Sequence, residues 1–167
     1  MSRIVIVGNS GSGKSTLAAR LQLPHLDLDT LAWQPSVTPP TRRELADSAA
    51  AIGAFCDAHD AWVVEGCYGD LAELALPRAN LLVLVEPGVD ACIANARARP
   101  WEPHKYASPQ AQDANLEMLI EWIRAYATRD DTCSLRAHRA LFDRFAGDTD
   151  RDKIELTTRE AIAAYRA

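Results

Sequence analysis

The chain has 167 residues, of which 48% are hydrophobic and 25% are charged, and its formal net charge at pH 7 is −5. This length and composition are typical of one globular domain with a substantial buried core, so we predict a single domain over residues 1–167. The negative net charge argues against a broad nucleic-acid-binding face, which is usually basic. No run reaches the roughly 18 apolar residues of a membrane span, so we expect no membrane contact.

The N-terminal segment predicts a buried strand followed by a helix. Residues 3–7 carry consecutive β-branched apolar side chains, which are typical of a parallel strand covered on both faces. This apolar run is short and ends in glycine without a cleavage-like region, so we predict no signal peptide. A helix is expected over residues 14–21, and a short second strand over residues 25–29.

The rest of the chain alternates between strand-like and helical patterns. We predict further strands at residues 61–65, 80–85 and 153–156. Further helices are predicted at residues 45–56, 89–99, 113–126 and 135–145, with a last helix at the C-terminus. Capping boxes at residues 41–44 and 157–160 are expected to open the first and last of these helices. The alternation predicts an α/β fold in which a parallel sheet carries helices on both faces.

Residues 99–113 break this pattern with three prolines and little apolar periodicity, and predict a small lid. Arg97 and Arg99 stand at its start and could clamp a transferring phosphoryl group from such a lid. The alternative for both arginines is a solvated helix end, where a cation interacts favourably with the helix dipole.

A glycine-rich loop joins the first strand to the first helix and matches the pattern GxxxxGK[ST]. Its residues are Gly8, Asn9, Ser10, Gly11, Ser12, Gly13, Lys14 and Ser15, and Thr16 follows. The glycines let successive backbone N–H groups face phosphate oxygens, and the helix N-terminus adds a favourable dipole. Lys14 can bridge the outer phosphates, Ser15 can ligate Mg²⁺, and Thr16 can contact an inner phosphate. The loop therefore predicts binding of ATP with Mg²⁺ and leaves the phosphoryl acceptor open.

Two acids, Asp27 and Asp29, end the predicted second strand. Strand residues two positions apart project to the same face, and ligands of open α/β sheets bind beyond the carboxyl ends of the strands. Asp29 is the candidate base, which would accept a proton from an attacking hydroxyl or hold Mg²⁺ through water, and Asp27 is a candidate substrate contact. The alternative is a pair of solvated turn acids, one of which caps the next segment.

Other candidates for an acceptor pocket follow the second and third strands. Glu65 could supply the acid that closes many nucleotide sites, and Gly66 could let a substrate approach closely. Trp33 and Tyr68 lie in loops expected beside the acceptor, although each could equally be a core anchor. Glu86, at the end of the fourth strand, is better explained as an acid before a turn.

The four cysteines are widely scattered, at Cys56, Cys67, Cys92 and Cys133. They form no CxxC pair, and indicate neither a disulfide framework nor a zinc site. We interpret them as reduced thiols of a cytoplasmic protein. His138 lies on an apolar helical stripe, where we expect a core histidine.

Three segments together resemble the small P-loop kinases: residues 8–16, residues 26–33 with the stretch Leu-Asp-Leu-Asp-Thr-Leu-Ala-Trp, and residues 62–68 with Trp-Val-Val-Glu-Gly-Cys-Tyr. The resemblance is strongest to the adenylate-kinase-related proteins called DNA topology modulation proteins, and covers roughly the first hundred residues well. It implies the P-loop NTPase fold of nucleoside monophosphate and shikimate kinases, with a five-stranded sheet ordered 2-3-1-4-5. It also implies that Asp29 lies near the acceptor and that Gly66 forms part of the acceptor wall.

This chain departs from those relatives at three places. The third strand ends in Glu65 where they usually have aspartate, and the lid carries His104 and Lys105 in place of a dense set of arginines. Between residues 30 and 70 the only cationic side chains are Arg42 and Arg43. This scarcity of cations weakens the case for a nucleoside monophosphate as the acceptor.

The sequence favours an ATP-dependent kinase that phosphorylates a small molecule or nucleotide, acting as a monomer or small homo-oligomer. An ATPase or a nucleotide-gated regulatory protein is the alternative, because it would share the phosphate loop. A GTPase is disfavoured, since no Asn-Lys-x-Asp stretch occurs. The sequence does not name the acceptor.

Overall fold

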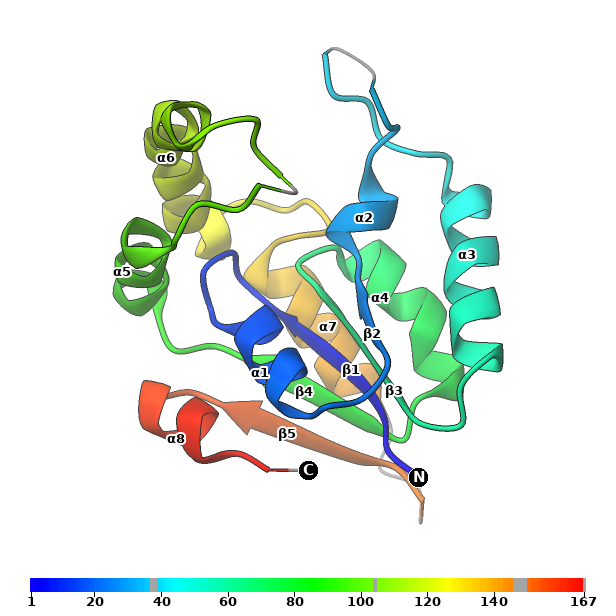
Figure 1. Ribbon diagram of the computed structural model, residues 1–167. Helices are drawn as coiled ribbons and strands as arrows, with labels where there is room; N and C mark the ends of the chain where they lie inside the picture. The colour runs from blue at the N-terminus through cyan, green and yellow to red at the C-terminus, as the bar shows by residue number, and fades with distance from the viewer. Residues whose placement is uncertain (37–38, 104, 146–149, 167) are drawn as a thin grey trace.

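The computed structural model describes residues 1–36, 39–103, 105–145 and 150–166. Its centre is a five-stranded parallel sheet with helices on both faces (Figure 1). The strands are β1 (Arg3–Gly8), β2 (His25–Asp27), β3 (Trp62–Gly66), β4 (Leu81–Val85) and β5 (Asp152–Leu156). They lie in the order β2-β3-β1-β4-β5, which confirms the predicted fold class and strand order.

The helices in these ranges differ greatly in length, and none is long and apolar enough to cross a membrane. They are α1 (Lys14–Arg20), α2 (Asp29–Ala32), α3 (Leu45–Asp57), α4 (Gly69–Ala75), α5 (Val89–Ala98), α6 (Pro109–Arg124), α7 (Leu135–Arg144) and α8 (Arg159–Ala164). Two short 3₁₀ turns, η1 (Leu76–Arg78) and η2 (Ala125–Ala127), complete the set.

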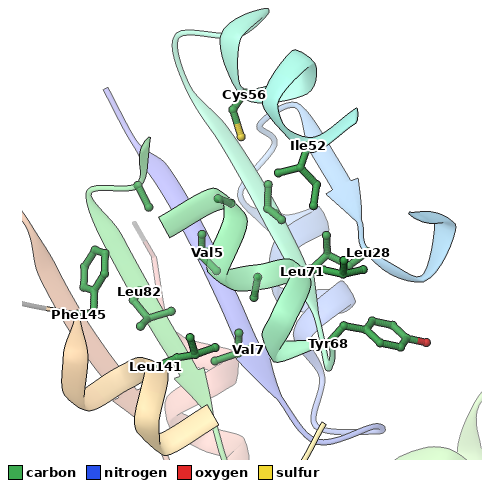
Figure 2. Close-up of a cluster of buried hydrophobic side chains, with 14 of the residues drawn as sticks. Val5, Val7, Leu28, Ile52, Cys56, Tyr68, Leu71, Leu82, Leu141 and Phe145 are labelled. Atoms are coloured by element: carbon green, nitrogen blue, oxygen red, sulfur yellow. The ribbon is translucent and has the colours of Figure 1, made fainter. Parts of the chain in front are cut away.

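Strand β1 divides the core because its alternate side chains point to opposite faces of the sheet. Val5 and Val7 pack in a cluster with α3, α4 and α7, which Figure 2 shows around Ile52 and Leu71. Ile4 and Ile6 pack on the other face against α1 and α8. All four β1 side chains have no exposed surface, so both faces of the central strand are sealed and its end is held firmly.

Strand β2 is shorter than predicted, and this corrects the geometry expected for its two acids. It ends at Asp27, and Asp29 begins α2. Asp27 Oδ1 accepts a hydrogen bond of 2.9 Å from the Asp29 backbone N–H, so Asp27 ends the strand by capping the following turn. The expectation that both side chains project from one strand is therefore wrong.

The start of one helix and the caps of two others also differ from the prediction. Helix α3 begins at Leu45 without a side-chain cap, because residues 41–43 pair with residues 32–34 instead of opening the helix. Helix α6 begins at Pro109, inside the predicted lid, because Ser108 caps it and proline suits the first helical turn. The last helix is capped by Thr158, one residue later than its capping box implied.

Helix α4 was not predicted. It has no side-chain cap and only seven residues, so its local signal is weak. Its buried side chains, Leu71, Ala72 and Ala75, join the cluster on the α3 and α7 face of the sheet. Tertiary packing therefore stabilises this helix.

His138 on α7 is a core histidine, as predicted, and is completely buried. Its Nε2 lies 2.7 Å from the Cys67 carbonyl oxygen, and its Nδ1 lies 2.8 Å from the Tyr126 hydroxyl. A carbonyl only accepts, so Nε2 carries the proton and the neutral ring accepts from Tyr126 at Nδ1. Burial lowers the pKa of His138 to about 4, which keeps the ring neutral.

We expect this burial to make the fold sensitive to acid. Between pH 6.5 and about pH 4 the unfolded chain protonates His138 while the folded chain does not, so the free energy of unfolding falls as pH is lowered. The loss converts to about 3 kcal/mol by linkage. Urea titrations across this pH window should show a smaller loss for His138→Gln than for the wild type. The variant His59→Gln is the control, and equal losses in all three proteins would contradict the prediction.

Candidate active site

A cleft of about 1430 Å³ opens at the carboxyl ends of β1, β2 and β3. It gathers most of the residues that the sequence singled out. These are Ser10, Gly11, Ser12, Gly13, Lys14, Ser15, Thr16, Asp27, Asp29, Trp33, Glu65, Gly66, Tyr68 and Arg99. Gly8, Asn9 and Arg97 do not line it. The cleft therefore joins the phosphate loop and the predicted acceptor residues in one space.

The phosphate loop has the backbone conformation that its glycines permit. Gly11 and Gly13 have φ angles of 76° and 97°, in the left-handed region that favours glycine. A Cβ on Gly11 would also lie 2.4 Å from the Cys92 carbonyl oxygen, so the loop packs tightly against α5. These constraints shape a turn whose backbone N–H groups can face an anion.

Lys14 is buried at the base of this loop, with 7% of its surface exposed. Its ammonium donates to the Asn9 carbonyl oxygen at 2.8 Å, and it forms no salt bridge within the described ranges. Ser12 Oγ is also buried there without a hydrogen-bond partner. A buried cation that makes no direct ion pair is costly, and an anion in the loop would offset that cost. These residues fit the phosphate groups of a nucleotide.

Ser15 is held by a buried carboxylate. Its hydroxyl donates to Glu65 Oε1 at 2.7 Å, and His25 Nε2 lies 3.4 Å from the same oxygen. Burial would raise the pKa of Glu65, but the hydrogen bond from His25 and the positive charge of Lys14 together lower it. Glu65 is therefore an ionised group that orients the hydroxyl expected to ligate Mg²⁺.

Asp27 and Asp29 meet at Lys105, which comes from the predicted lid. Lys105 Nζ lies 2.8 Å from Asp29 Oδ2 and 3.8 Å from Asp27 Oδ2. Burial would raise the pKa of Asp29, but the charge and hydrogen bond of Lys105 lower it. Burial and the negative charges of Glu65 and Asp29 raise the pKa of Asp27. The pKa values of the two acids are thus displaced in opposite directions. Such a displacement is typical of two carboxylates of which one acts as an acid and the other as a base.

An aromatic wall lies beside these acids. Trp33 Nε1 donates to the Tyr68 hydroxyl at 3.0 Å, and the Arg42 guanidinium stands 5.0 Å from the Tyr68 ring centre and 5.8 Å from that of Trp33. Asp70 accepts from Arg42 at 2.7 Å and fixes its position. The structure therefore places one oriented cation and two aromatic rings in the predicted acceptor region.

Gly66 lines the cleft, and its role in the acceptor wall stays a prediction, but the structure gives a separate reason for a glycine here. A Cβ at this position would lie 2.8 Å from Leu28 Cβ. The missing side chain makes room for Leu28, which is fully buried beside β3, so packing within the protein alone requires a glycine here.

The two candidate lid arginines lie in different places. Arg99 lines the cleft and donates to Glu102 Oε2 at 3.1 Å, while Arg97 lines only a small neighbouring pocket. His104 lies outside the described residues. The lid remains a prediction. Lys105, which belongs to the predicted lid, contacts the candidate base Asp29 directly.

Sequence reasoning missed the residues that support the phosphate loop from a distance. Asn95 Nδ2 donates to the Gly11 carbonyl oxygen at 2.8 Å, and Arg159 donates to Asn95 Oδ1 at 3.0 Å. Asn9 Nδ2 donates to the Ile123 carbonyl oxygen at 3.1 Å. These partners are 64 to 114 positions apart in the chain, so no local pattern could have revealed them.

The strand order and the loop after β1 define the chain as a P-loop NTPase fold. No family model and no curated protein matches it. Among solved structures, it is similar to a sugar kinase from Janibacter sp. HTCC2649, with 14% identity, a TM-score of 0.49, and coverage of 98% of this chain and 91% of that one.

Two shikimate kinases are also similar. The enzyme from Acinetobacter baumannii, solved with shikimate, has 16% identity and a TM-score of 0.42 over 84% of this chain and 91% of its own. The enzyme from Bacteroides thetaiotaomicron has 18% identity and a TM-score of 0.43 over 98% and 93%. These similarities are too remote to assign a substrate, and the resemblance to the DNA topology modulation proteins stays a prediction.

Replacing Lys14 should abolish turnover without unfolding the protein. Lys14→Ala removes a preorganised cation, and losing one such group costs roughly a hundred- to a thousandfold in rate. The thermal midpoint should not fall, because the lost ammonium has no carboxylate partner among the described residues. ATP turnover and thermal unfolding measure the two effects, with Arg144→Ala, an exposed α7 substitution, as the control. Near-normal turnover of Lys14→Ala would refute this assignment.

Removing Lys105 should raise the pKa of Asp29. In Lys105→Met, burial remains while the nearest positive charge is lost, so the Asp29 carboxyl should titrate at higher pH than in the wild type. An NMR titration of the Asp29 carboxyl carbon gives this value directly. Arg136→Met, which removes an exposed α7 cation, should leave it unchanged. An unaltered pKa in Lys105→Met would show that Lys105 does not control the acid.

Proposed function

We propose that this protein is an ATP-dependent kinase that transfers the γ-phosphoryl group of ATP to a hydroxyl of a small molecule or nucleotide. The observation that carries the proposal is the ionised Asp29 in the same cleft as the phosphate loop. The positive charge of Lys14 is one of the causes that lower the pKa of Asp29, so the two groups act within one electrostatic environment. A nucleotide on the loop and an acceptor beside Asp29 would therefore face each other.

The residues divide the reaction between them. The loop and Lys14 would hold the phosphates, and Ser15, oriented by Glu65, would hold Mg²⁺. When bound, Mg²⁺ would neutralise the negative charge of the phosphates. Asp29 would accept the proton of the acceptor hydroxyl as the oxygen of that hydroxyl forms a bond to the γ-phosphorus. The bond from that phosphorus to the bridging oxygen breaks, and ADP leaves with the electron pair.

Lys105 holds Asp29 ready for this role but also covers it. Its ammonium binds Asp29 Oδ2 at 2.8 Å, so an acceptor hydroxyl that approaches this oxygen would compete with Lys105. Asp27 lines the same cleft and would contact the acceptor from beside Asp29.

The wall of Trp33, Tyr68 and Arg42 supports a small acceptor with an apolar or planar face. Both rings line the cleft, and Arg42 keeps donors beyond the one that binds Asp70. Arg99 would contribute charge near the phosphates from the lid side, and Arg97, outside the cleft, would not.

The test compares Asp29→Asn with Asp27→Asn. Asp29→Asn should slow phosphoryl transfer roughly a hundred- to ten-thousandfold, the usual value of general-base assistance. ATP affinity should change little, because the phosphate loop supplies most of the binding. Single-turnover rates and calorimetric dissociation constants for ATP separate the two effects.

Asp27→Asn is the matched control and should have the smaller effect on rate. Wild-type ATP turnover should also rise when a fractionated pool of metabolites is added. A wild-type rate in Asp29→Asn would leave the protein as a nucleotide binder. Turnover that no metabolite fraction stimulates would favour an ATPase or a nucleotide-gated regulator.

A further inference from the structure

The fold brings together two cysteines that lie far apart in the sequence. Cys67 follows β3 directly, and Cys133 lies between η2 and α7. Both residues line the same cleft, and each thiol shifts the pKa of the other. The other two cysteines lie elsewhere, Cys56 on α3 and Cys92 on α5.

Hydrogen bonds hold the two cysteine-bearing loops against each other. The Gly69 backbone N–H donates to the Thr132 carbonyl oxygen at 2.8 Å, and a Cβ on Gly69 would lie 2.6 Å from that oxygen. His138 donates to the Cys67 carbonyl oxygen at 2.7 Å, and Arg129 donates to that of Cys133 at 2.7 Å. The two backbones are therefore held side by side by hydrogen bonds that do not involve the thiols.

Both thiols line the cleft beside the phosphate loop. Cys67 is partly exposed, whereas Cys133 is buried, with 5% of its surface exposed. A small reagent entering the cleft would thus meet Cys67 first. The neighbouring Cys133 thiol and the positive charge of Lys14 lower the pKa of Cys67, which favours the reactive thiolate.

We propose that Cys67 and Cys133 are a redox-active dithiol, which low-molecular-weight disulfides convert to an intramolecular disulfide in the wall of the cleft. The loops that carry the two thiols are hydrogen-bonded to each other within two residues of each cysteine, and such proximity is what a disulfide requires. This proposal rests on the placement of the two side chains and is independent of the proposed kinase activity.

The reaction takes two exchange steps. The Cys67 thiolate attacks one sulfur of the small disulfide, whose S–S bond breaks and releases one thiolate. Cys133 then loses its proton and attacks Cys67 Sγ, which releases the second thiolate from the mixed disulfide. Two protein thiols are oxidised, and one small disulfide is reduced to two thiols.

Oxidised glutathione is the probe for the test. The fully reduced protein is incubated with oxidised glutathione, and acid then stops the exchange and unfolds the protein. The remaining free thiols are alkylated afterwards, and the peptides are mapped by mass spectrometry. We expect a Cys67–Cys133 disulfide, with Cys56 and Cys92 recovered alkylated. The pair should react at least roughly tenfold faster than those two thiols, because burial raises the pKa of each of them to about 11.

Variants identify the two steps. Cys133→Ser should stop at a stable glutathione adduct on Cys67, because the second exchange has no thiol. Cys56→Ser is the control and should form the disulfide as the wild type does. Phenylarsine oxide, which bridges two adjacent thiols with loss of water, provides a second measurement on the unmutated protein and should bind once, to Cys67 and Cys133.

Three results would overturn the proposal. These are recovery of both cysteines as alkylated thiols, a disulfide that involves Cys56 or Cys92, and a wild-type protein that stops at the mixed disulfide on Cys67. Mass mapping reads all three without an assay of phosphoryl transfer, so a failure of the kinase proposal would leave this result unaffected.

Discussion

The ammonium of Lys14, buried where the sealed central strand meets the first helix, is a positive charge that several titratable groups of the cleft share. It makes no direct ion pair in the described part of the chain, and its charge acts on the groups around it. It is among the causes that lower the pKa values of Asp29, Glu65 and Cys67. A site built around a buried cation favours anions, both as ligand phosphates and as neighbouring carboxylates.

The three carboxylates around that charge have different tasks because their immediate partners differ. Glu65 faces Ser15 and His25, and so serves the phosphate side. Asp29 faces Lys105 and remains ionised, whereas Asp27 lacks so close a cation and its pKa is raised. A single cation from the predicted lid thus distinguishes two acids that are close in sequence. This contact links the conformation of the segment after α5 to the state of the candidate base.

Much of the fold could be predicted because its elements carry local signals. The β-branched run of β1, the glycine pattern after it, and the alternation of strands and helices predicted a parallel α/β sheet, and the resemblance to small P-loop kinases supplied its strand order. One error arose where a side chain binds the backbone: Asp27 caps the turn at Asp29 and so ends β2 early. Helix α4 was missed because its stability comes from packing against the sheet. Gly66 was singled out for substrate approach, which stays a prediction, whereas the atoms that a side chain there would meet belong to Leu28.

The sequence by itself determined the phosphate loop and the central strand that presents it, since hydrogen bonding, glycine conformation and hydrophobic periodicity act over a few residues. Only the tertiary structure decided which distant groups surround that loop. The contact of Lys105 with Asp29 spans 76 positions, that of Asn95 with Gly11 spans 84, and the bond from Gly69 to Thr132 that joins the two cysteine-bearing loops is equally non-local. Such contacts follow from how the helices pack on the sheet, and packing depends on the shape of the whole core, which no short segment encodes.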